Sequence, residues 1–465
     1  MTSLLIKNGK IVTADSMYVA DILCENGVIA KIEKKIAAKK DVQVIDATGK
    51  YVFPGFIDPH THVYLPFMGS FACDNYETGT KAALCGGTTT VLDFVIPGRT
   101  EEPLKALETW HSQAKGHAAC DYAFHMSVMR FDDQIKSQLR EIVTKEGISS
   151  FKVFLAYKGS LGIEDAELYH TLKFAKEQGV MVMSHCEHAD MIVELQKELV
   201  AANKLGPEYH YASRPPLVEA DGTHHFCTMA QLLDVPVYIV HLSCEESLRI
   251  AADAKLHGAK VWIETLIAYL TLDKSCAERP NFEGAKFVMS PPLRDKHNQE
   301  ILWNALRSGL ISTVATDHAP FNSQQKLMGK DNFCKIPNGL AAIEDRIRLL
   351  YTNGVCEGKL DLCKLVDIAS TQAAKIFNLF PRKGTIQLGS DADLVVYDPD
   401  YQGVISAKTH HMNIDYSCFE GFKVKGRCAA VTVRGNVQVR DGEFVGEVGI
   451  GQFVKRDPGF YNWKV

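Results

Sequence analysis

The chain contains 465 residues, 46% of them hydrophobic and 23% charged, and its formal net charge is −5. A chain of this length and ordinary globular composition can form more than one hydrophobic core. Its basic residues are scattered and no apolar stretch is long enough to span a bilayer, which argues against nucleic acid or a membrane as a partner. We therefore expect a small neutral molecule as the substrate.

The cysteines bear on the cellular compartment. There are 13 of them, an odd number, without the paired spacing of zinc fingers or small disulfide scaffolds. No signal-peptide pattern is apparent. These features favour a reducing cytoplasm, and we interpret Cys186 and Cys244 as small buried side chains rather than nucleophiles.

The residue patterns at both ends of the chain predict short β-strands. In the first fifty residues, apolar runs alternate with turn signals at Asn8-Gly9 and Asn26-Gly27, which is typical of a small antiparallel sheet. The same pattern returns late in the chain, where Ala392 to Tyr397 ends at Asp398-Pro399 and Ala429 to Arg434 precedes another turn. We expect the two ends to build one smaller composite β-sandwich domain.

Between these ends, apolar strand-like runs alternate with helical spacing, as in Glu164 to Gln178 and Glu245 to His257. This alternation predicts an α/β fold with a (β/α)8 TIM-like barrel. The predicted strands are Phe53 to His62, Thr88 to Phe94, Tyr122 to Val128, Ser150 to Tyr157, Val180 to Cys186, Val237 to Ser243, Lys260 to Leu266 and Ile311 to His318. Unusually long connections follow Cys186 and Leu266, as expected for functional loops at a barrel mouth.

The predicted domain boundaries follow from these patterns. Residues 1–52 and 376–446 form the β-sandwich, residues 53–375 form the barrel, and residues 447–465 form a C-terminal tail. The tail contains Phe460-Tyr-Asn-Trp463, which we expect to pack on a neighbouring surface.

Metal-ligand side chains recur where the predicted strands end, and in a barrel these ends meet at one mouth. His60 and His62 are spaced so that both face the same side of a strand. The strand-end candidates are His60 and His62 on the first strand, Lys152 on the fourth, His185 on the fifth, His241 on the sixth and Asp317 on the eighth. Their coincidence predicts a metal site.

Four imidazoles and a carboxylate exceed what one tetrahedral zinc ion normally takes from a protein. Two metal ions account for the set more naturally, and two cations roughly 3.5 to 4 Å apart can share a hydroxide that stays ionised at neutral pH. Nitrogen and oxygen ligands without cysteine suit zinc, with cobalt, manganese and iron as alternatives. Such a centre hydrolyses polarised carbonyl groups.

Lys152 is the unusual member of this set. A lysine in an apolar strand commonly pairs with an acid or extends its amine to solvent. Burial also lowers the pKa of the amine, and a neutral amine can react with carbon dioxide to form a carbamate, which would make Lys152 a bridging anionic ligand.

The ordered motifs resemble those of the cyclic amidohydrolases in the amidohydrolase superfamily, specifically the dihydropyrimidinase and D-hydantoinase branch. The resemblance covers nearly the whole chain, and the ordered set is far more specific than any single piece. The matching pieces are Gly55-Phe-Ile-Asp-Pro-His-Thr-His62, Phe151-Lys-Val-Phe154, His185, Ser213-Arg-Pro215, His241, Ser290-Pro-Pro-Leu-Arg294, Thr316-Asp-His318, Ile336-Pro-Asn-Gly339 and Gly384-Thr-Ile-Gln-Leu-Gly-Ser-Asp-Ala-Asp-Leu394.

The resemblance implies a role for each candidate. His60, His62 and Asp317 would hold one divalent metal ion, His185 and His241 the other, and carboxylated Lys152 would bridge the two ions, which we expect to be zinc. Tyr157 would donate to the developing oxyanion, and Ser290 and Asn338 would contact the cyclic imide or ureide through main-chain groups. Asp317 would also act as general acid and base. A packed aromatic residue is the alternative interpretation of Tyr157.

The loops after the first and fourth strands should shape the pocket for the ring substituent. Leu65, Phe67 and Phe154 predict that this pocket is apolar. Dihydroorotases resemble this pattern but carry an arginine where Tyr64 stands, and that arginine receives the carboxylate of their substrate. Tyr64 therefore argues against dihydroorotate.

Four residues lie beside the candidate ligands in the sequence but are not assigned as metal ligands. Glu187, His188, Asp190 and His318 lie either on the opposite face of a strand or farther along a loop, and we interpret them as supporting residues.

The expected function is thus that of a hydrolase acting on C–N bonds in cyclic amides, which opens dihydropyrimidines or 5-substituted hydantoins to N-carbamoyl amino acids, as in pyrimidine catabolism. The resemblance further implies a homotetramer. An allantoinase-like ureide hydrolase, a hydrolase of exocyclic amines or esters, and a non-enzymatic dihydropyrimidinase-related binding protein are the alternatives. The complete set of ligands argues against the non-enzymatic protein.

Overall fold

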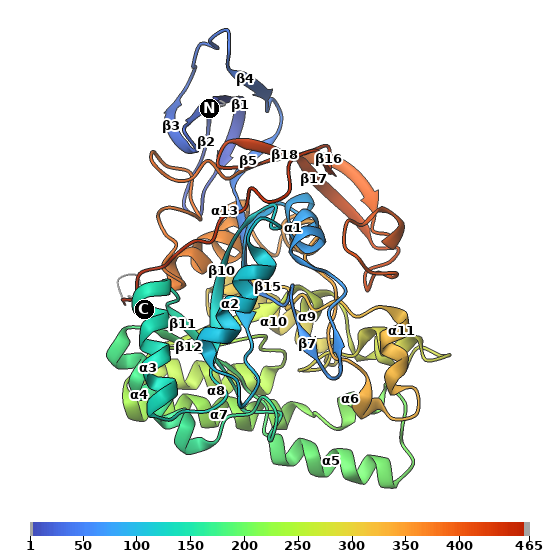
Figure 1. Ribbon diagram of the computed structural model, residues 1–465. Helices are drawn as coiled ribbons and strands as arrows, with labels where there is room; N and C mark the ends of the chain where they lie inside the picture. The colour runs from blue at the N-terminus through green and yellow to red at the C-terminus, as the bar shows by residue number, and fades with distance from the viewer. Residues whose placement is uncertain (1–2, 460–465) are drawn as a thin grey trace.

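The computed structural model describes residues 3–459, so Phe460-Tyr-Asn-Trp463 lies outside the described residues. The protein has two parts, a barrel surrounded by helices and a separate β domain (Figure 1). In the figure the blue strands of the N-terminal segment and the orange and red strands of the C-terminal segment lie together at the top. No helix in the described part of the chain is both long and apolar enough to cross a membrane.

The barrel consists of eight parallel strands in the order in which they occur in the chain. They are β6 (Phe56–Thr61), β9 (Thr88–Val95), β10 (Asp121–Ser127), β11 (Ser150–Phe154), β12 (Met181–His185), β13 (Val237–Ile239), β14 (Val261–Leu266) and β15 (Thr313–Ala315). These strands are buried throughout, as is typical of parallel strands covered by helices on the outside. The predicted (β/α)8 barrel is confirmed.

Backbone hydrogen bonds between the end of β6 and the residues that follow β15 close the ring. The amide of Asp317 donates to the carbonyl of His60 at 2.9 Å, and the amide of His62 donates to the carbonyl of His318 at 2.8 Å. The closing contacts therefore involve residues of the candidate metal site itself.

Several predicted strands are too long. The first one breaks at Gly55, because β5 (Tyr51–Pro54) joins the other sheet and only β6 enters the barrel. A Cβ atom at Gly55 would lie 2.0 Å from Oγ1 of Thr89, so the close approach of the chain to β9 requires glycine there. The fourth, sixth and eighth strands end before Tyr157, His241 and Asp317, which lie in the following turns.

Helices connect the strands and cover the outside of the barrel (Figure 1). They are α1 (Tyr76–Cys85), α2 (Pro103–Ala114), α3 (Asp133–Glu141), α4 (Asp165–Gln178), α5 (Ala189–Ala201), α6 (Tyr209–Ala212), α7 (Pro216–Leu233), α8 (Glu245–Leu256), α9 (Ile267–Thr271), α10 (His297–Ser308), α11 (Ser323–Lys326), α12 (Arg346–Leu350), α13 (Leu362–Val366) and α14 (Gln372–Ile376). The long connection after Cys186 contains α5 to α7, and the one after Leu266 contains α9 and α10.

The composite β domain is also confirmed, since strands from both ends of the chain share one sheet. Its order is β19-β18-β17-β16-β5-β1-β2-β3, with β4 paired to β1. Besides β5, the strands are β1 (Leu4–Val12), β2 (Met17–Glu25), β3 (Val28–Glu33), β4 (Gln43–Asp46), β16 (Leu394–Val404), β17 (Lys423–Val433), β18 (Asn436–Arg440) and β19 (Glu443–Phe444). A hairpin formed by β7 (Pro66–Phe67) and β8 (Ser70–Phe71) lies apart from both sheets.

Two turn predictions in this domain are wrong. Asn8-Gly9 does not reverse the chain but forms an irregularity inside β1, where Asn8 adopts a φ of 61° and the pairing with β2 shifts register. Asp398-Pro399 likewise lies within β16 at a register shift. We propose that the first domain boundary lies at Gly55 and that the later boundaries lie where the sequence predicts them, after residues 375 and 446.

A buried network of charges joins the barrel to the β domain. The ammonium of Lys383 lies 2.8 Å from a carboxylate oxygen of Asp121 at the start of β10, and 3.0 and 2.6 Å from those of Asp391 and Asp393 before β16. Arg434 also pairs with Asp121. These carboxylates lie close enough together to resemble a metal site, but Lys383 and Arg434 already neutralise them.

Replacing Lys383 with methionine should lower the free energy of unfolding by about 3–5 kcal/mol, because buried carboxylates then lose the cation that they share. Urea unfolding would measure this loss. Arg382→Met is the matched control, since the Arg382 side chain is 46% exposed where it pairs with Asp391 and should contribute less than about 1 kcal/mol. Equal losses in the two variants would contradict a stabilising role for the buried network.

Candidate metal and substrate site

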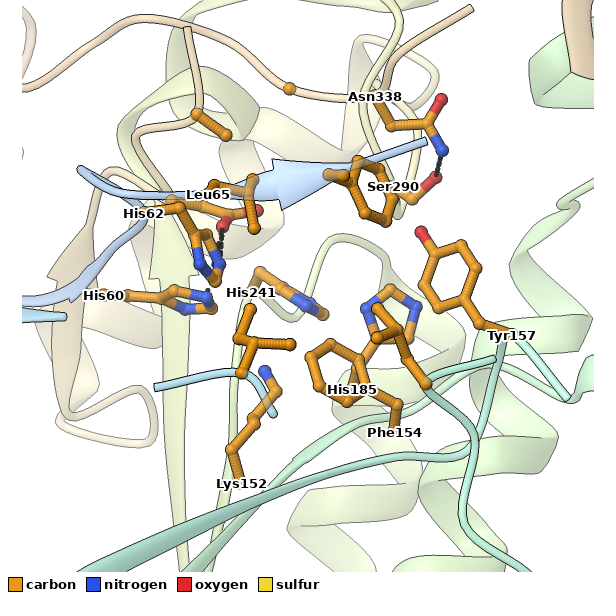
Figure 2. A pocket seen from close by; sticks show the side chains of 16 residues that line it. His60, His62, Leu65, Lys152, Phe154, Tyr157, His185, His241, Ser290 and Asn338 are labelled. Carbon is orange, nitrogen blue, oxygen red and sulfur yellow. Dashed lines mark hydrogen bonds and ion pairs between the residues drawn. The ribbon is translucent and has the colours of Figure 1, made fainter. Parts of the chain in front are cut away.

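Every residue predicted for the metal and substrate sites lines one cavity at the barrel mouth. The cavity has an empty volume of about 510 Å³, including its open end. Its lining residues are His60, His62, Leu65, Phe67, Ile96, Lys152, Phe154, Tyr157, Leu161, His185, His241, Ser290, Asp317, Ala319, Asn338 and Gly339. Figure 2 shows the side chains of His60, His62, Lys152, His185 and His241 gathered around a common space.

His60, His62 and Asp317 form a compact group of potential ligands. Oδ1 of Asp317 lies 3.1 Å from Nε2 of His60 and 3.1 Å from Nε2 of His62. The other ring nitrogen of His60, Nδ1, lies 2.7 Å from Oε1 of Glu264, which fixes the ring and leaves Nε2 facing the cavity.

The charges around His60 favour a cation at this point. Burial alone would lower the pKa of His60, but the carboxylates of Asp317 and Glu264 outweigh it and raise the pKa to about 9. Burial likewise opposes ionisation of Asp317, yet the two imidazoles hold its pKa well below the usual value. A bound metal ion would supply the positive charge that these two carboxylates favour.

His185 and His241 form the other side of the candidate metal centre, with ring centroids 4.6 Å apart. Nε2 of His185 lies 2.6 Å from Oε2 of Glu187, so Nδ1 is the nitrogen left for a metal ion. The backbone amide of His241 donates to Oε1 of Glu264 at 3.0 Å. Glu264 therefore positions one histidine from each side of the centre.

Three residues of the cavity have left-handed backbone conformations, with φ angles of 62° at Tyr157, 40° at His241 and 51° at Asp317. Such conformations cost non-glycine residues about 1 kcal/mol or more and are concentrated at functional sites. Each follows shortly after a strand end, so the chain turns sharply there and directs the side chain into the cavity.

Lys152 lies at the base of the cavity and is 1% exposed. Its ammonium lies 5.1 and 5.0 Å from the ring centroids of Phe94 and Phe154, and no carboxylate among the described residues is within ion-pair distance of it. Burial lowers the pKa of its amine to about 8, although Asp317 and Glu264 oppose the shift. The lowered pKa increases the fraction of neutral amine at neutral pH, which is the form that carbon dioxide can modify.

The opposite wall of the cavity carries the predicted substrate residues. The phenol oxygen of Tyr157 points toward Ser290 and Asn338 in Figure 2, and the side-chain amide of Asn338 donates to Oγ of Ser290 at 3.0 Å. Leu65, Phe67 and Phe154 supply apolar surface, to which the structure adds Ile96 and Leu161. The cavity thus combines polar groups at one end with an apolar wall.

Sequence reasoning missed three residues that position this site. Glu264 lies in the middle of β14, Arg214 follows α6, and Lys326 ends α11. The 1%-exposed ammonium of Lys326 donates to the carbonyls of Val288, Pro337 and Gly339, tying together the two segments that present Ser290 and Asn338. The position of Glu264, a charged residue inside an apolar strand, could have indicated its role. Arg214 was noted only as part of the motif Ser213-Arg-Pro215, without a role of its own.

The four residues that the sequence predicts to be supporting residues rather than ligands do not line the cavity. Glu187 and His318 are buried and pair with His185 and Asp74 respectively. His188 caps the start of α5, and Asp190 forms an exposed ion pair with Lys158.

The donor atoms present therefore fit divalent metal ions. The nitrogen and carboxylate donors of His60, His62 and Asp317 all lie within 4.8 Å of one another. His185, His241 and Lys152 supply further donors from the same cavity, without cysteine. This set suits zinc and related metals.

Comparisons with known proteins agree with this architecture. The chain matches the Amidohydrolase family over residues 51–438. A D-hydantoinase from Geobacillus stearothermophilus is 48% identical over 453 residues, which cover 97% of this chain and 96% of the relative. A dihydropyrimidinase from Dictyostelium discoideum is 40% identical over 458 residues, which cover 98% and 91% of the two chains.

A solved structure of a D-hydantoinase (dihydropyrimidinase) from Thermus sp. superimposes with a TM-score of 0.97 at 56% sequence identity. The match covers 98% of this chain and 100% of that one. The chain therefore belongs to the amidohydrolase family, in the branch that contains the D-hydantoinases and dihydropyrimidinases.

Proposed function

We propose that the protein is a metal-dependent cyclic amidohydrolase. It would open the ring of dihydropyrimidines, such as 5,6-dihydrouracil and dihydrothymine, or of 5-substituted hydantoins, and release N-carbamoyl amino acids. The observation that carries this proposal is a single cavity lined both by the predicted metal ligands and by Tyr157, Ser290 and Asn338. The names of the similar D-hydantoinases and dihydropyrimidinases support the same substrate class.

The proposed centre holds two divalent ions, zinc being favoured by the donor set. His60, His62 and Asp317 would hold one ion, His185 and His241 the other, and a carboxylated Lys152 would bridge them. When bound, such a pair of ions acidifies water and so supplies a hydroxide nucleophile at neutral pH. Burial of Lys152 without an anionic partner supports the carboxylation, which turns a buried cation into an anionic ligand.

Asp317 has the geometry for moving the proton. Its Oδ1 is engaged by both His60 and His62, so the other carboxylate oxygen, Oδ2, is the proposed proton acceptor. Asp317 would take the proton of the attacking nucleophile at Oδ2 and return it to the ring nitrogen that leaves.

Tyr157 has the geometry for stabilising the oxyanion. Its hydroxyl points into the cavity and forms no hydrogen bond with any residue in the described part of the chain. A donor that is free in this way can bond to the carbonyl oxygen as it gains charge, which is typically worth ~3 kcal/mol in the transition state.

The cavity also disfavours a substrate that carries a carboxylate. Lys152 is the only lysine or arginine among the described residues that line it, and the proposed carbamate would remove that charge. Tyr64 does not line the cavity, since its ring packs edge-on against Trp110 with 4.9 Å between centroids. These features support neutral cyclic amides rather than dihydroorotate.

We also propose, from the sequence, an assembly and a cellular compartment for the protein. A homotetramer in a reducing cytoplasm would suit an enzyme of pyrimidine catabolism, and the free state of the 13 cysteines is compatible with it. Light scattering of the purified protein would test the assembly.

A substrate panel tests the proposed reaction. Dihydrouracil or a 5-substituted hydantoin with an apolar substituent should be opened to the N-carbamoyl amino acid without release of ammonia. The rate should exceed that with dihydroorotate, because the cavity offers no partner for a carboxylate, and that with allantoin, because the apolar wall offers no partner for its polar ureido group. Ring absorbance and product analysis would follow the reaction. Release of ammonia, or no turnover by protein that holds two equivalents of metal, would overturn the proposal.

Replacing Lys152 with alanine should abolish both metal binding and turnover, because the proposed bridge between the ions is lost. Metal content per chain and ring-opening rate are the measurements. Lys145→Ala is the control, since Lys145 forms an exposed ion pair with Glu141 outside the cavity lining and should leave both quantities unchanged. Two bound metal ions and a full rate in Lys152→Ala would refute the carbamate.

Replacing Tyr157 with phenylalanine should lower the ring-opening rate about 10²- to 10³-fold while the metal content stays the same, because one oxyanion donor is removed. Tyr64→Phe removes a phenol oxygen outside the cavity and should leave the rate unchanged. If both variants turned over at the normal rate, Tyr157 would have no part in the mechanism.

A further inference from the structure

A layer of buried ion pairs lies beside the cavity, and beyond the contact of Glu187 with His185 it has no role in the mechanism described so far. It consists of Arg214, Arg294, Glu187 and Glu219, each at most 3% exposed. The two arginines come from the motifs Ser213-Arg-Pro215 and Ser290-Pro-Pro-Leu-Arg294. Buried charges of this kind are costly unless they are paired, so their arrangement relative to the cavity is informative.

Arg294 has the contacts of a structural residue. Its guanidinium lies 2.8 Å from Oε2 of Glu219 and donates to Oγ of Ser243 at 2.8 Å. It also donates to the backbone carbonyl of Arg214 at 2.5 Å. Arg294 therefore fixes the backbone of Arg214 without contacting a residue that lines the cavity.

Arg214 instead contacts Tyr157 directly and is linked to His185 through Glu187. Its guanidinium carbon lies 5.3 Å from the ring centroid of Tyr157, within the range of a cation–π contact. One of its terminal nitrogens pairs with Oε2 of Glu187, and the same carboxylate oxygen accepts from Nε2 of His185 at 2.6 Å. The contacts thus run from Tyr157 through Arg214 and Glu187 to His185.

The guanidinium of Arg214 is only partly paired by hydrogen bonds. Its Nε is buried without a hydrogen-bond partner among the described residues. Arg214 also lines a second cavity that shares Phe67, Tyr157, Leu161 and Asn338 with the first. The positive charge of Arg214 therefore lies next to the phenol ring at the border between the two cavities.

A fixed positive charge at this place has a chemical consequence. When the hydroxyl of Tyr157 donates to an oxyanion, electron density shifts toward the phenol oxygen and its ring. A guanidinium against the ring stabilises that shift more in the transition state than in the ground state, and because Arg214 is 3% exposed, bulk water screens its charge little.

We infer that Arg214 is a positioning residue for ring opening. It holds the ring of Tyr157 in place and stabilises the charge that the phenol receives, while Glu187 links this arrangement to His185. The inference rests on the proposed role of Tyr157 as the oxyanion donor.

A double-mutant cycle between Arg214 and Tyr157 tests the inference in the metal-loaded protein. With dihydrouracil or a 5-substituted hydantoin, Arg214→Met should lower kcat on the order of tenfold and change KM by less than about twofold, because the contact acts mainly in the transition state. In a Tyr157→Phe background, the same substitution should change kcat by less than about twofold. Arg214→Lys keeps the charge and should recover part of the loss.

Arg214→Met leaves Glu187 buried without its cation, which can impair folding. A second variant, Arg214→Met with Glu187→Gln, removes both charges and should show the same dependence on Tyr157. Arg456→Met is the matched control, since Arg456 is a buried arginine that contacts Ser150 and Phe124 rather than Arg214 or Tyr157, so any loss of kcat should be equal in both backgrounds.

The outcomes separate the inference from the proposed function. If Tyr157→Phe lowers the ring-opening rate as expected but Arg214→Met lowers kcat equally with and without Tyr157, only the inference is overturned. Loss of metal from Arg214→Lys and from the doubly neutralised variant would also overturn it, since Arg214 would then act through the ligands. A full rate in Tyr157→Phe alone would overturn the role of Tyr157 and the inference with it.

Discussion

The closure of the barrel between its first and eighth strands is the contact on which the site depends. The backbone hydrogen bonds from Asp317 to His60 and from His62 to His318 complete the ring of strands. They also bring the Asp317 carboxylate to 3.1 Å from both imidazoles. The carboxylate of Asp58 strengthens the seam, because it accepts from the hydroxyl of Thr316 at 2.6 Å. Stability and ligand placement therefore share the same few contacts, and a substitution that opens this seam would damage both.

Buried carboxylates hold the histidines on both sides of the centre. Glu264 binds the ring of His60 and the backbone of His241, and its second oxygen accepts from the hydroxyl of Tyr238 at 2.8 Å. Glu187 binds the ring of His185 and is neutralised by Arg214. A carboxylate on the outer nitrogen of a ligand histidine fixes its ring and strengthens its basicity, so the cavity-facing nitrogen is prepared for a metal ion. This preparation is built by residues that do not line the cavity.

The strand order and the cavity-lining side chains could be predicted from the sequence, because parallel strands bring their carboxyl ends together whatever lies between them. The supporting residues could not. Glu264 lies two residues before its strand ends, and Arg214 reaches Tyr157 only after the long connection folds back. The left-handed backbone of Asp317 and His241 also left no sequence signal, since neither residue is glycine. The turn predicted at Asn8-Gly9 is wrong for the opposite reason. A dipeptide that is typical of turns can also form an irregularity within a continuous strand.

The loop after β11 couples the proposed oxyanion donor to the apolar wall that meets the ring substituent. Tyr157 leaves the strand in a left-handed conformation, and its carbonyl accepts from the amides of Ser160 at 3.1 Å and Gly162 at 2.9 Å. Leu161, inside this tight turn, lines the same cavity. A Cβ atom at Gly162 would lie 2.7 Å from the carbonyl oxygen of Ala156, so the turn has little freedom to change shape. Because one rigid turn carries both groups, a change of the loop that admits a larger substituent would also displace the phenol. Substrate range and rate should therefore vary together when this loop is altered, whereas changes at Leu65 or Phe67 on the opposite hairpin can alter the pocket and leave the backbone of Tyr157 in place.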